Sequence, residues 1–406
     1  MHQGAEERLL RRVHLYRGAE EQTETKTKKH RLLLGASSFI SSEFSSSLSP
    51  PPCSKIKRSL LEEARRYMKY ATAVYGQAMI NAAQVDAGGR LDGKVGRVTK
   101  ETISAHIQVP EDDIVLLDVS NLKGSSNHLR HMVVVDHEHE KVVLSIRGTF
   151  SLEEIIMDVA AFSREFCGGE AHSEMANMAE RVWTVAGPKI KEVLSENPGY
   201  EFILTGHSLG AGAACLLSIL VQNKKFLPRE QGIRCFAFAS PPVYTPLEFV
   251  PKTVRSTTNF VHENDVVPFL SIQKVRKLLS SLQAVDQYAR DHMSGKQITS
   301  LILGASPPPK DLIASVLEAE GSRLVPKKGA PTLYIPAETV VLLKENLDEK
   351  GEHSDGSYRY ELTNARELSQ REIRVYPDMF VDHFPSRYEH VFDHLEKRDD
   401  DDDDDE

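Results

Sequence analysis

The chain has 406 residues, of which 40% are hydrophobic and 27% are charged, close to the averages for folded globular proteins. A chain of this kind can bury a large core, which excludes a disordered protein, a collagen-like fibre and a disulfide-stapled miniprotein. The formal net charge of −9 comes almost entirely from the acidic run at residues 399–406. The rest of the chain is nearly neutral and has no general attraction for polyphosphate, so nucleic acid is not an expected partner.

The cysteines are few and far apart in the sequence, at positions 53, 167, 215 and 235. They form no C-x-x-C pair, which argues against a disulfide framework and a zinc site and fits a reducing compartment. No apolar run approaches the roughly 18–20 residues that a membrane span requires. We therefore expect a cytoplasmic protein without a transmembrane helix.

The two ends of the chain have the composition of disordered segments. Residues 1–58 are rich in basic residues and serine and include three consecutive prolines, so they bury too little apolar surface to offset the entropy of ordering. We expect a disordered leader, with electrostatic attachment to an anionic membrane face as the alternative. Residues 398–406 are expected to be a solvated tail, and calcium binding there has little support because no spacing builds a coordination shell.

In chain order, the first regular pattern is an apolar helical periodicity, which predicts a helix over residues 60–80. Next, residues 132–135 and 142–146 predict a strand hairpin with a charged tip. His137 and His139 lie in this tip, where a solvated turn is favoured over a metal site.

Further short, β-branched apolar runs predict strands at residues 202–204, 235–239 and 260–261. Helical stretches are predicted between them, at residues 174–194 and 208–221. Strands that alternate with helices indicate an α/β fold with a mostly parallel central sheet flanked by helices.

The strongest chemical signal is the G-x-S-x-G motif Gly206-His207-Ser208-Leu209-Gly210. The motif alone is a weak signal, but here a predicted strand precedes it and a run of small residues that begins a helix follows it. This is the strand–turn–helix context of a nucleophile elbow, whose strained turn and close packing require glycine on both sides. We therefore predict Ser208 as a nucleophile; the alternative is a glycine-rich turn that only packs a helix.

A serine hydroxyl needs a base, which in turn is oriented by an acid. In this class of fold the acid comes before the base in the chain, and both follow the serine. The apolar strand at residues 260–261 runs into a polar turn, where Asp265 is the predicted acid and Glu263 its competitor. A strand-end aspartate is often only a turn former.

The base is expected in the histidine-rich stretch near the end of the chain. His383 follows a strand predicted at residues 373–376 and precedes a helix that begins near residue 385, so it lies on a loop that can reach the serine. His390 and His394 are one helical turn apart, which suits a solvated face or, as an alternative, a surface metal site. His383 is the predicted base.

An acyl-transfer site also needs donors for the negative charge that develops on the carbonyl oxygen. One should be the backbone N–H of Leu209, the residue after the nucleophile. The second is predicted at Thr149, because Gly148 lets the loop after the strand at residues 142–146 turn tightly. Losing one such donor typically costs about 10²–10³-fold in rate.

These pieces together resemble the class 3 lipases, a branch of the α/β-hydrolases. The matching residues are 145–149, 206–212, 265–268 and His383, and the resemblance covers about residues 60–397. Within the family the chain is most similar to the sn-1-specific diacylglycerol lipases. That closer likeness comes from the helix at residues 64–76, the spacing across residues 147–158 and the 118 positions between acid and base.

The resemblance implies a lipase domain at residues 59–397, with an insertion at residues 270–335. It implies hydrolysis of the sn-1 ester of diacylglycerol to a fatty acid and a 2-monoacylglycerol through an acyl-enzyme, with no required cofactor. The expected protein is a monomer whose partner is a lipid at a membrane or droplet surface. Triacylglycerol lipase, phospholipase or galactolipase A1, and an inactive lipase-like binding scaffold are the alternatives.

Two features differ from the animal diacylglycerol lipases, and two segments have more than one interpretation. Those lipases begin with several transmembrane helices, whose absence here implies peripheral attachment, and Glu174 stands where the family usually has glycine. The segment at residues 150–169 is a predicted lid, with an ordinary core helix as the alternative for its first half. The insertion is interpreted as a flexible gate or a simple surface excursion. The apolar residues expected to line the lid and the substrate entrance are Phe150, Leu152, Ile155, Ile156 and Val159.

Overall fold

A computed structural model describes most of the region between residues 56 and 395. The described residues are 56–86, 99–118, 131–148, 163–262, 265–294, 296–297, 309–323, 331–347, 353–371, 373 and 381–395. The predictions for the N-terminal leader up to residue 55, for the lid up to residue 162, for the strand at residues 374–376 and for the acidic tail lie outside these residues. Across the described parts of the chain, no helix combines the length and apolarity needed to cross a bilayer.

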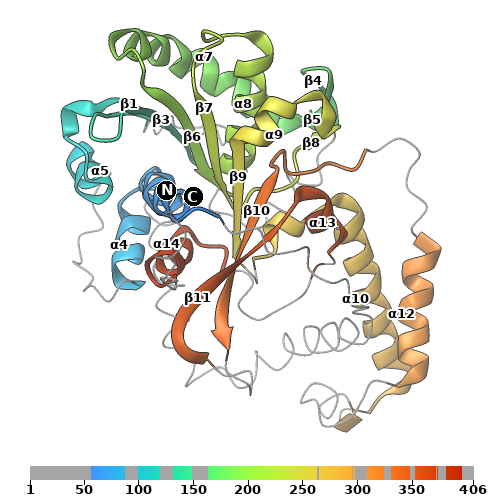
Figure 1. Cartoon of the computed structure of the whole chain (residues 1–406). Coiled ribbons are helices and arrows are strands. Elements are labelled where there is room, and N and C mark those ends of the chain that lie inside the picture. Colours follow the sequence, from blue (N-terminus) through green and yellow to red (C-terminus); the bar gives the residue numbers. More distant parts are fainter. Residues whose placement is uncertain are drawn as a thin grey trace, which may run out of the picture.

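An eight-stranded sheet forms the centre of the molecule, in the order β1-β2-β3-β6-β7-β9-β10-β11 (Figure 1). The five inner strands β3, β6, β7, β9 and β10 are parallel, whereas β1, β2 and β11 pair antiparallel at the two edges. The predicted, mostly parallel sheet is thereby confirmed. The strands are β1 (Ile114–Asp118), β2 (His131–Asp136), β3 (Lys141–Ile146), β6 (Glu201–His207), β7 (Ile233–Phe238), β9 (Thr257–His262), β10 (Thr339–Leu347) and β11 (His353–Thr363).

The inner strands are apolar on both faces because helices cover both sides of the sheet. In β6, the side chains of Phe202 and Leu204 join one core cluster, and that of Ile203 joins the other. Val142 and Val143 of β3 divide in the same way. Alternate side chains of a strand therefore point to opposite faces of the sheet and pack into two separate cores, one on each face.

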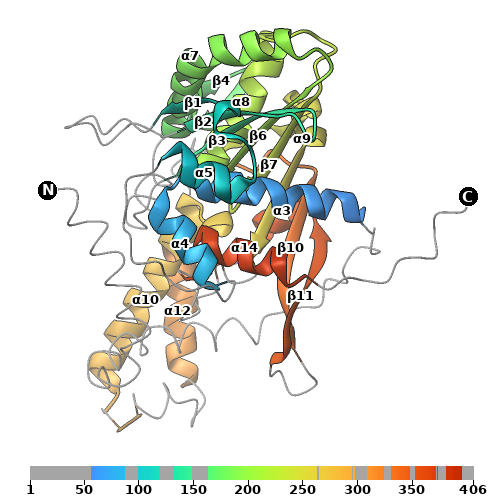
Figure 2. The same ribbon diagram turned by 90° about the vertical axis from the view of Figure 1, so that its left-hand side faces the viewer.

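Each face of the sheet has its own group of helices (Figures 1 and 2). On one face lie α7 (Ser173–Glu196) and α8 (Leu209–Lys224). On the other lie α3 (Arg58–Ala73), α4 (Gln77–Asp86), α5 (Lys100–Ile107) and α14 (Pro385–Asp393). This three-layer arrangement agrees with the α/β-hydrolase fold that the resemblance implies. The remaining elements near it are α9 (Pro251–Ser256), α13 (Ala365–Gln370) and a small sheet of β4 (Ser163–Phe166), β5 (Gly169–His172) and β8 (Tyr244–Thr245).

The first predicted helix is wrong in one respect, because the structure divides it into α3 and α4. The break falls at Gly76, whose φ of 101° is open to glycine and strained for other residues. Apolar residues on both sides of the break pack into the same core cluster, so the periodicity continues across it. The turn between the two helices brings Tyr75 to the carboxyl end of the central strands.

The long separation between Asp265 and His383 is filled partly by helices and partly by strands. Two helices of the insertion, α10 (Ile272–His292) and α12 (Lys310–Arg323), lie side by side and extend away from the sheet (Figures 1 and 2). They share a small apolar cluster of Val285, Leu312 and Val316 that is separate from the main cores. The chain then returns to add β10 and β11, which the sequence analysis did not identify.

Candidate active site

Ser208 lies on the sharp turn between β6 and α8. Its backbone has φ 60° and ψ −130°, a combination that residues with a side chain rarely adopt and that costs conformational energy. Hydrogen bonds on both sides hold the turn: the Ser208 N–H donates to the Phe238 carbonyl at 2.9 Å, and the Ala211 N–H donates to the Ser208 carbonyl at 3.0 Å. The neighbouring structure therefore fixes the strained turn in place.

The two glycines of the motif allow the turn to pack against β3. A Cβ on Gly206 would lie 2.6 Å from the carbonyl carbon of Gly210 and 2.8 Å from the carbonyl oxygen of Ile146. A Cβ on Gly210 would collide with the same Ile146 oxygen. Any larger residue at either position would push the elbow away from β3, which gives the G-x-S-x-G pattern its physical reason.

The three predicted side chains Ser208, His383 and Asp265 meet at the carboxyl end of the sheet. His383 Nε2 lies 2.9 Å from Ser208 Oγ, and His383 Nδ1 lies 2.9 Å from each carboxylate oxygen of Asp265. All three residues are buried, and Ser208 is 0% exposed. The arrangement is that of a hydroxyl with a base in contact and an acid behind the base.

Asp265 is held by two further donors. Its Oδ1 accepts the Val267 N–H at 2.9 Å, and its Oδ2 accepts the Tyr388 hydroxyl at 2.6 Å. Burial, and then the neighbouring Asp265, raises the pKa of Tyr388, so the phenol stays protonated and donates. Tyr388 also accepts the His262 N–H at 2.9 Å, which ties α14 to the end of β9 and fixes the carboxylate in place.

Tyr388 was not among the residues that the sequence analysis selected. The only signal for it was its position on the predicted helix after His383. A position on a predicted helix does not indicate which polar group the side chain contacts. The contact with Asp265 spans 123 positions in the chain, so it becomes visible only once α14 is packed against β9.

The competing histidines lie elsewhere. His394 is exposed, with its ring 4.2 Å from that of His390, and neither contacts Ser208. His137 and His139 lie in the turn between β2 and β3, where His139 Nδ1 is 2.9 Å from Asp136 Oδ1. In the described part of the chain, no three or more His, Cys, Asp or Glu side chains gather in a way that could hold a metal ion. Glu263, the competing acid, lies outside the described residues.

Only part of the predicted oxyanion site is described. Leu209 is the first residue of α8, so its N–H is one of the helix-start donors that have no partner within the helix. Thr149 lies outside the described residues, as do the lid residues Phe150, Leu152, Ile155, Ile156 and Val159. Gly148, directly before Thr149, is described and buried, and its N–H donates to the Tyr75 hydroxyl at 3.2 Å. Thr149 and the lid up to residue 162 therefore stay predictions, whereas residues 163–169 form β4 and the turn into β5, with Phe166 buried in the core.

Glu174, which departs from the family pattern, occupies an ordinary helical position. It lies in the first turn of α7, where a negative charge is favourable because of the helix dipole. His172, two residues before Glu174, is the N-cap of the helix, and its ring nitrogen accepts the Met175 N–H at 3.5 Å. The departure from glycine is therefore compatible with the start of α7.

Two buried histidines flank the cluster of Ser208, His383 and Asp265, and their surroundings favour the neutral ring. Burial, and then the charge of Arg387, lowers the pKa of His262 from 6.5 to about 4. Burial, and then the neighbouring His383, holds the pKa of His207 well below its ordinary value. The ring of His207 lies 4.7 Å from that of His383, so a neutral His207 adds no positive charge beside the base.

These pKa values predict a loss of stability in weak acid. An unfolded histidine has its ordinary pKa near 6.5, so between pH 6.5 and 4 the unfolded chain binds more protons than the folded one. The stabilisation by His262 is therefore complete above pH 6.5 and disappears as the pH falls toward 4. We expect the free energy of unfolding in urea to be about 2 kcal/mol lower at pH 5 than at pH 7.5 from His262 alone.

The variant His262→Gln isolates this effect. In this variant, the difference in the free energy of unfolding between pH 7.5 and pH 5 should be about 2 kcal/mol smaller than in the wild type. His137→Gln is the matched control for the exchange of a histidine for glutamine, because the His137 side chain is half exposed. Equal pH dependence in all three proteins would contradict the assignment to His262.

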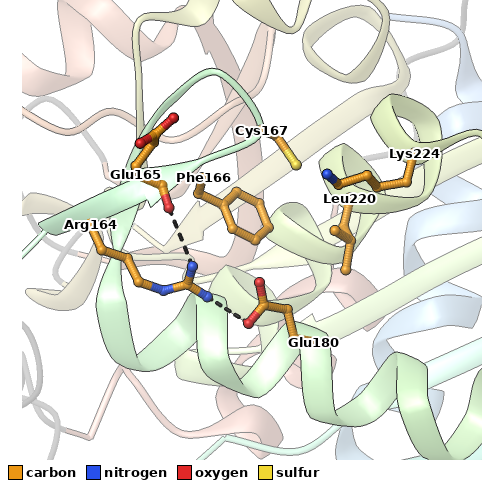
Figure 3. Close-up of a pocket in the computed structure, with 7 residues that line it drawn as sticks. All are labelled: Arg164, Glu165, Phe166, Cys167, Glu180, Leu220 and Lys224. Carbon is orange, nitrogen blue, oxygen red and sulfur yellow. Dashed lines mark hydrogen bonds and ion pairs between the residues drawn. The ribbon is translucent and has the colours of Figure 1, made fainter.

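A surface cavity of about 240 Å³ lies apart from these residues, between the β4–β5 hairpin and helices α7 and α8 (Figure 3). Inside it the Arg164 guanidinium donates to the Glu180 carboxylate at 2.7 Å and to the Glu165 carbonyl at 3.3 Å. Burial raises the pKa of the Cys167 thiol, which disfavours the reactive thiolate. No member of the Ser208 cluster lines this cavity, whose walls are Arg164, Glu165, Phe166, Cys167, Glu180, Leu220 and Lys224.

Comparison with known proteins agrees with this site. Residues 143–275 match the model of the family described as Lipase (class 3), which confirms the resemblance. The stretch includes most of β3, the Ser208 elbow and Asp265. His383 and the helices α3 and α14 lie outside it.

The relatives of known name include diacylglycerol lipases. Diacylglycerol lipase-beta of Mus musculus is 30% identical over 158 residues, which cover 37% of this chain and 23% of the mouse protein. The secreted mono- and diacylglycerol lipase A of Penicillium cyclopium is 26% identical over 227 residues, covering 53% of this chain and 67% of the fungal protein. The chain therefore spans less than a quarter of the mouse relative.

Among solved structures, a lipase from Rhizopus microsporus var. chinensis is 19% identical with a TM-score of 0.42, covering 57% of this chain and 77% of that chain.

Proposed function

We propose that the protein is a serine lipase that hydrolyses the sn-1 ester of diacylglycerol to a fatty acid and a 2-monoacylglycerol. The observation that carries the proposal is the contact of 2.9 Å between Ser208 Oγ and His383 Nε2, with Asp265 on the other side of the ring. A hydroxyl in this setting is an activated nucleophile for acyl transfer.

In the proposed first half-reaction, Ser208 Oγ attacks the ester carbonyl and its proton passes to His383 Nε2. The carbonyl oxygen takes up negative charge, for which Leu209 and Thr149 are the proposed donors. Asp265 accepts the hydrogen bond from Nδ1 and stabilises the imidazolium that forms. The C–O bond then breaks, His383 gives its proton to the leaving glycerol oxygen, and the acyl group remains on Ser208.

The second half-reaction repeats these steps with water. His383 takes a proton from water as the water oxygen attacks the acyl carbon, and then returns a proton to Ser208 Oγ as the fatty acid leaves. The steps use side chains and backbone N–H groups of this protein together with the ester and water, so we propose that the reaction needs no cofactor.

The choice of diacylglycerol rests on the relatives, among which are proteins named as diacylglycerol lipases and as a mono- and diacylglycerol lipase. Other relatives carry only the name lipase, which keeps triacylglycerol, phospholipid and galactolipid as competing substrates. We further propose that a monomer meets its substrate peripherally, at a membrane or droplet surface.

A lipid panel tests the substrate. Purified full-length protein is given diacylglycerol with different acyl chains at sn-1 and sn-2, and also triacylglycerol, phosphatidylcholine and galactolipid, with products identified by mass spectrometry. We expect the sn-1 fatty acid and the 2-acyl monoglyceride as the main products, and none with Ser208→Ala. Faster release from another lipid class would reassign the substrate, and no release from any of them would favour the binding scaffold.

A further inference from the structure

Tyr75 places one hydroxyl beside the candidate active site from a distant part of the chain. It lies in the turn between α3 and α4 and is 3% exposed. Three groups surround its oxygen at 3.2 Å: the Gly148 N–H donates to it, the His207 carbonyl accepts from it, and His207 Nδ1 lies at the same distance. A hydroxyl that both accepts and donates in this way connects two backbone segments.

The two connected segments are the ones on which the proposed chemistry depends. Gly148 directly precedes Thr149, the predicted second oxyanion donor, and His207 directly precedes the nucleophile. A Cβ on Gly148 would lie 2.6 Å from the Tyr75 hydroxyl and 2.7 Å from the His207 carbonyl oxygen. The three residues are therefore packed as closely as a glycine permits, and a small shift of the loop would be resisted on both sides.

The helix that precedes Tyr75, α3, is itself fixed to the sheet. Ser145 Oγ of β3 donates to the Tyr70 carbonyl at 2.9 Å, and Thr205 Oγ1 of β6 lies 3.4 Å from the Tyr67 carbonyl. These are the two strands that lead into Gly148 and His207. The end of α3 therefore has a defined position relative to both segments, and the Arg147 guanidinium lies 5.7 Å from the centre of the Tyr75 ring.

The protonation states keep this contact intact at neutral pH. Burial raises the pKa of Tyr75, so the phenol keeps its proton and donates. His207 is neutral, as described above, and so presents no positive charge to the hydroxyl. The bridge thus consists of neutral groups that lie in the interior.

We propose that Tyr75 is a positioning residue for ester hydrolysis: its hydroxyl holds Gly148 against the His207–Ser208 turn and so sets the distance between the oxyanion donors and Ser208 Oγ. The inference rests on the proposed function and deepens it. It assigns a role to the α3–α4 turn, which lies outside the stretch matched by the family model. Displacement of the donors weakens binding of the tetrahedral transition state more than binding of the ester itself.

The test compares Tyr75→Phe with Tyr67→Phe. Tyr67 is a fully buried tyrosine on α3, the helix that precedes Tyr75. Its hydroxyl has no hydrogen-bond partner within the described structure, so the control also loses one buried hydroxyl. For both variants, kcat and KM are measured with p-nitrophenyl butyrate, together with inhibition by phenylboronic acid, which becomes tetrahedral on the serine. Titration with a fluorophosphonate counts competent sites, so that kcat refers to folded protein only.

For Tyr75→Phe we expect kcat about tenfold lower, less than the loss of a whole oxyanion donor. We also expect a boronate inhibition constant raised by a similar factor and KM within about twofold of wild type. Tyr67→Phe should match wild type in all three quantities. Unchanged kcat and boronate inhibition in Tyr75→Phe, or equal losses in both variants, overturn the inference. Wild-type protein that does not hydrolyse the ester overturns the proposed function, and this inference with it.

Discussion

Replacing Ser208 by alanine is expected to lower the rate of ester hydrolysis by about 10⁴–10⁶-fold, because the attacking oxygen is removed while the rest of the site stays in place. The change deletes one buried oxygen atom and leaves the backbone of the elbow intact, so the fold should be preserved. Turnover of diacylglycerol and of p-nitrophenyl butyrate, followed together with thermal unfolding, measures both effects.

Ser218→Ala is the matched control for this result. Ser218 is a fully buried serine on α8, and the described residues place it against Gln222 at 3.1 Å, apart from the catalytic cluster. We expect wild-type turnover from it.

A second check is non-additivity: the double variant Ser208→Ala with His383→Ala should be no slower than Ser208→Ala alone, because the two residues act as one unit. A Ser208→Ala protein with wild-type turnover would contradict the assignment of the nucleophile.

Asp265→Asn is expected to lower kcat by about 10⁴-fold with a much smaller change in KM. An amide of the same size fits the site, but it no longer offers His383 Nδ1 a negatively charged acceptor, so the imidazole loses its favoured tautomer and the imidazolium is less stable. The Tyr388 hydroxyl, which donates to this carboxylate at 2.6 Å, would keep the side chain in place. Steady-state kinetics at several pH values, with thermal unfolding to check the fold, measures the change.

Glu263→Gln is the control for the acid, since this residue competed with Asp265 on sequence grounds. We expect it to keep kcat within a few-fold of wild type. If Glu263→Gln were severely impaired and Asp265→Asn nearly normal, the acid would have to be reassigned, and the contact between His383 and Asp265 would be structural only.

The elbow was the easiest part of the site to predict from sequence, because its physics is local. A buried strand, a strained turn and a helix that packs closely against the strand leave a short pattern of glycines around Ser208, and the structure shows which atoms those glycines avoid. Asp265 and His383 were also predicted from local signals. For Asp265 the signal is a polar turn after a predicted strand, and for His383 it is a loop before a predicted helix.

The contacts of Tyr75 and Tyr388 could not be predicted in the same way. Each depends on how a distant helix packs on the sheet, and helical periodicity shows only that a residue is buried. The break at Gly76 was missed because the apolar pattern runs through it. The strands β10 and β11 and the paired helices α10 and α12 depend on long-range packing as well, so the separation of acid and base indicated an insertion but not its form.

Covalent labelling with a fluorophosphonate tests the central claim most directly, because such a probe reacts quickly only with a serine whose base is in place. Intact full-length protein is treated with the probe, digested, and the modified residue identified by mass spectrometry. Labelling is predicted at Ser208 alone and should be lost or strongly slowed in His383→Ala. Absence of label at Ser208, or an unchanged labelling rate in His383→Ala, would contradict the claim that Ser208 and His383 act together.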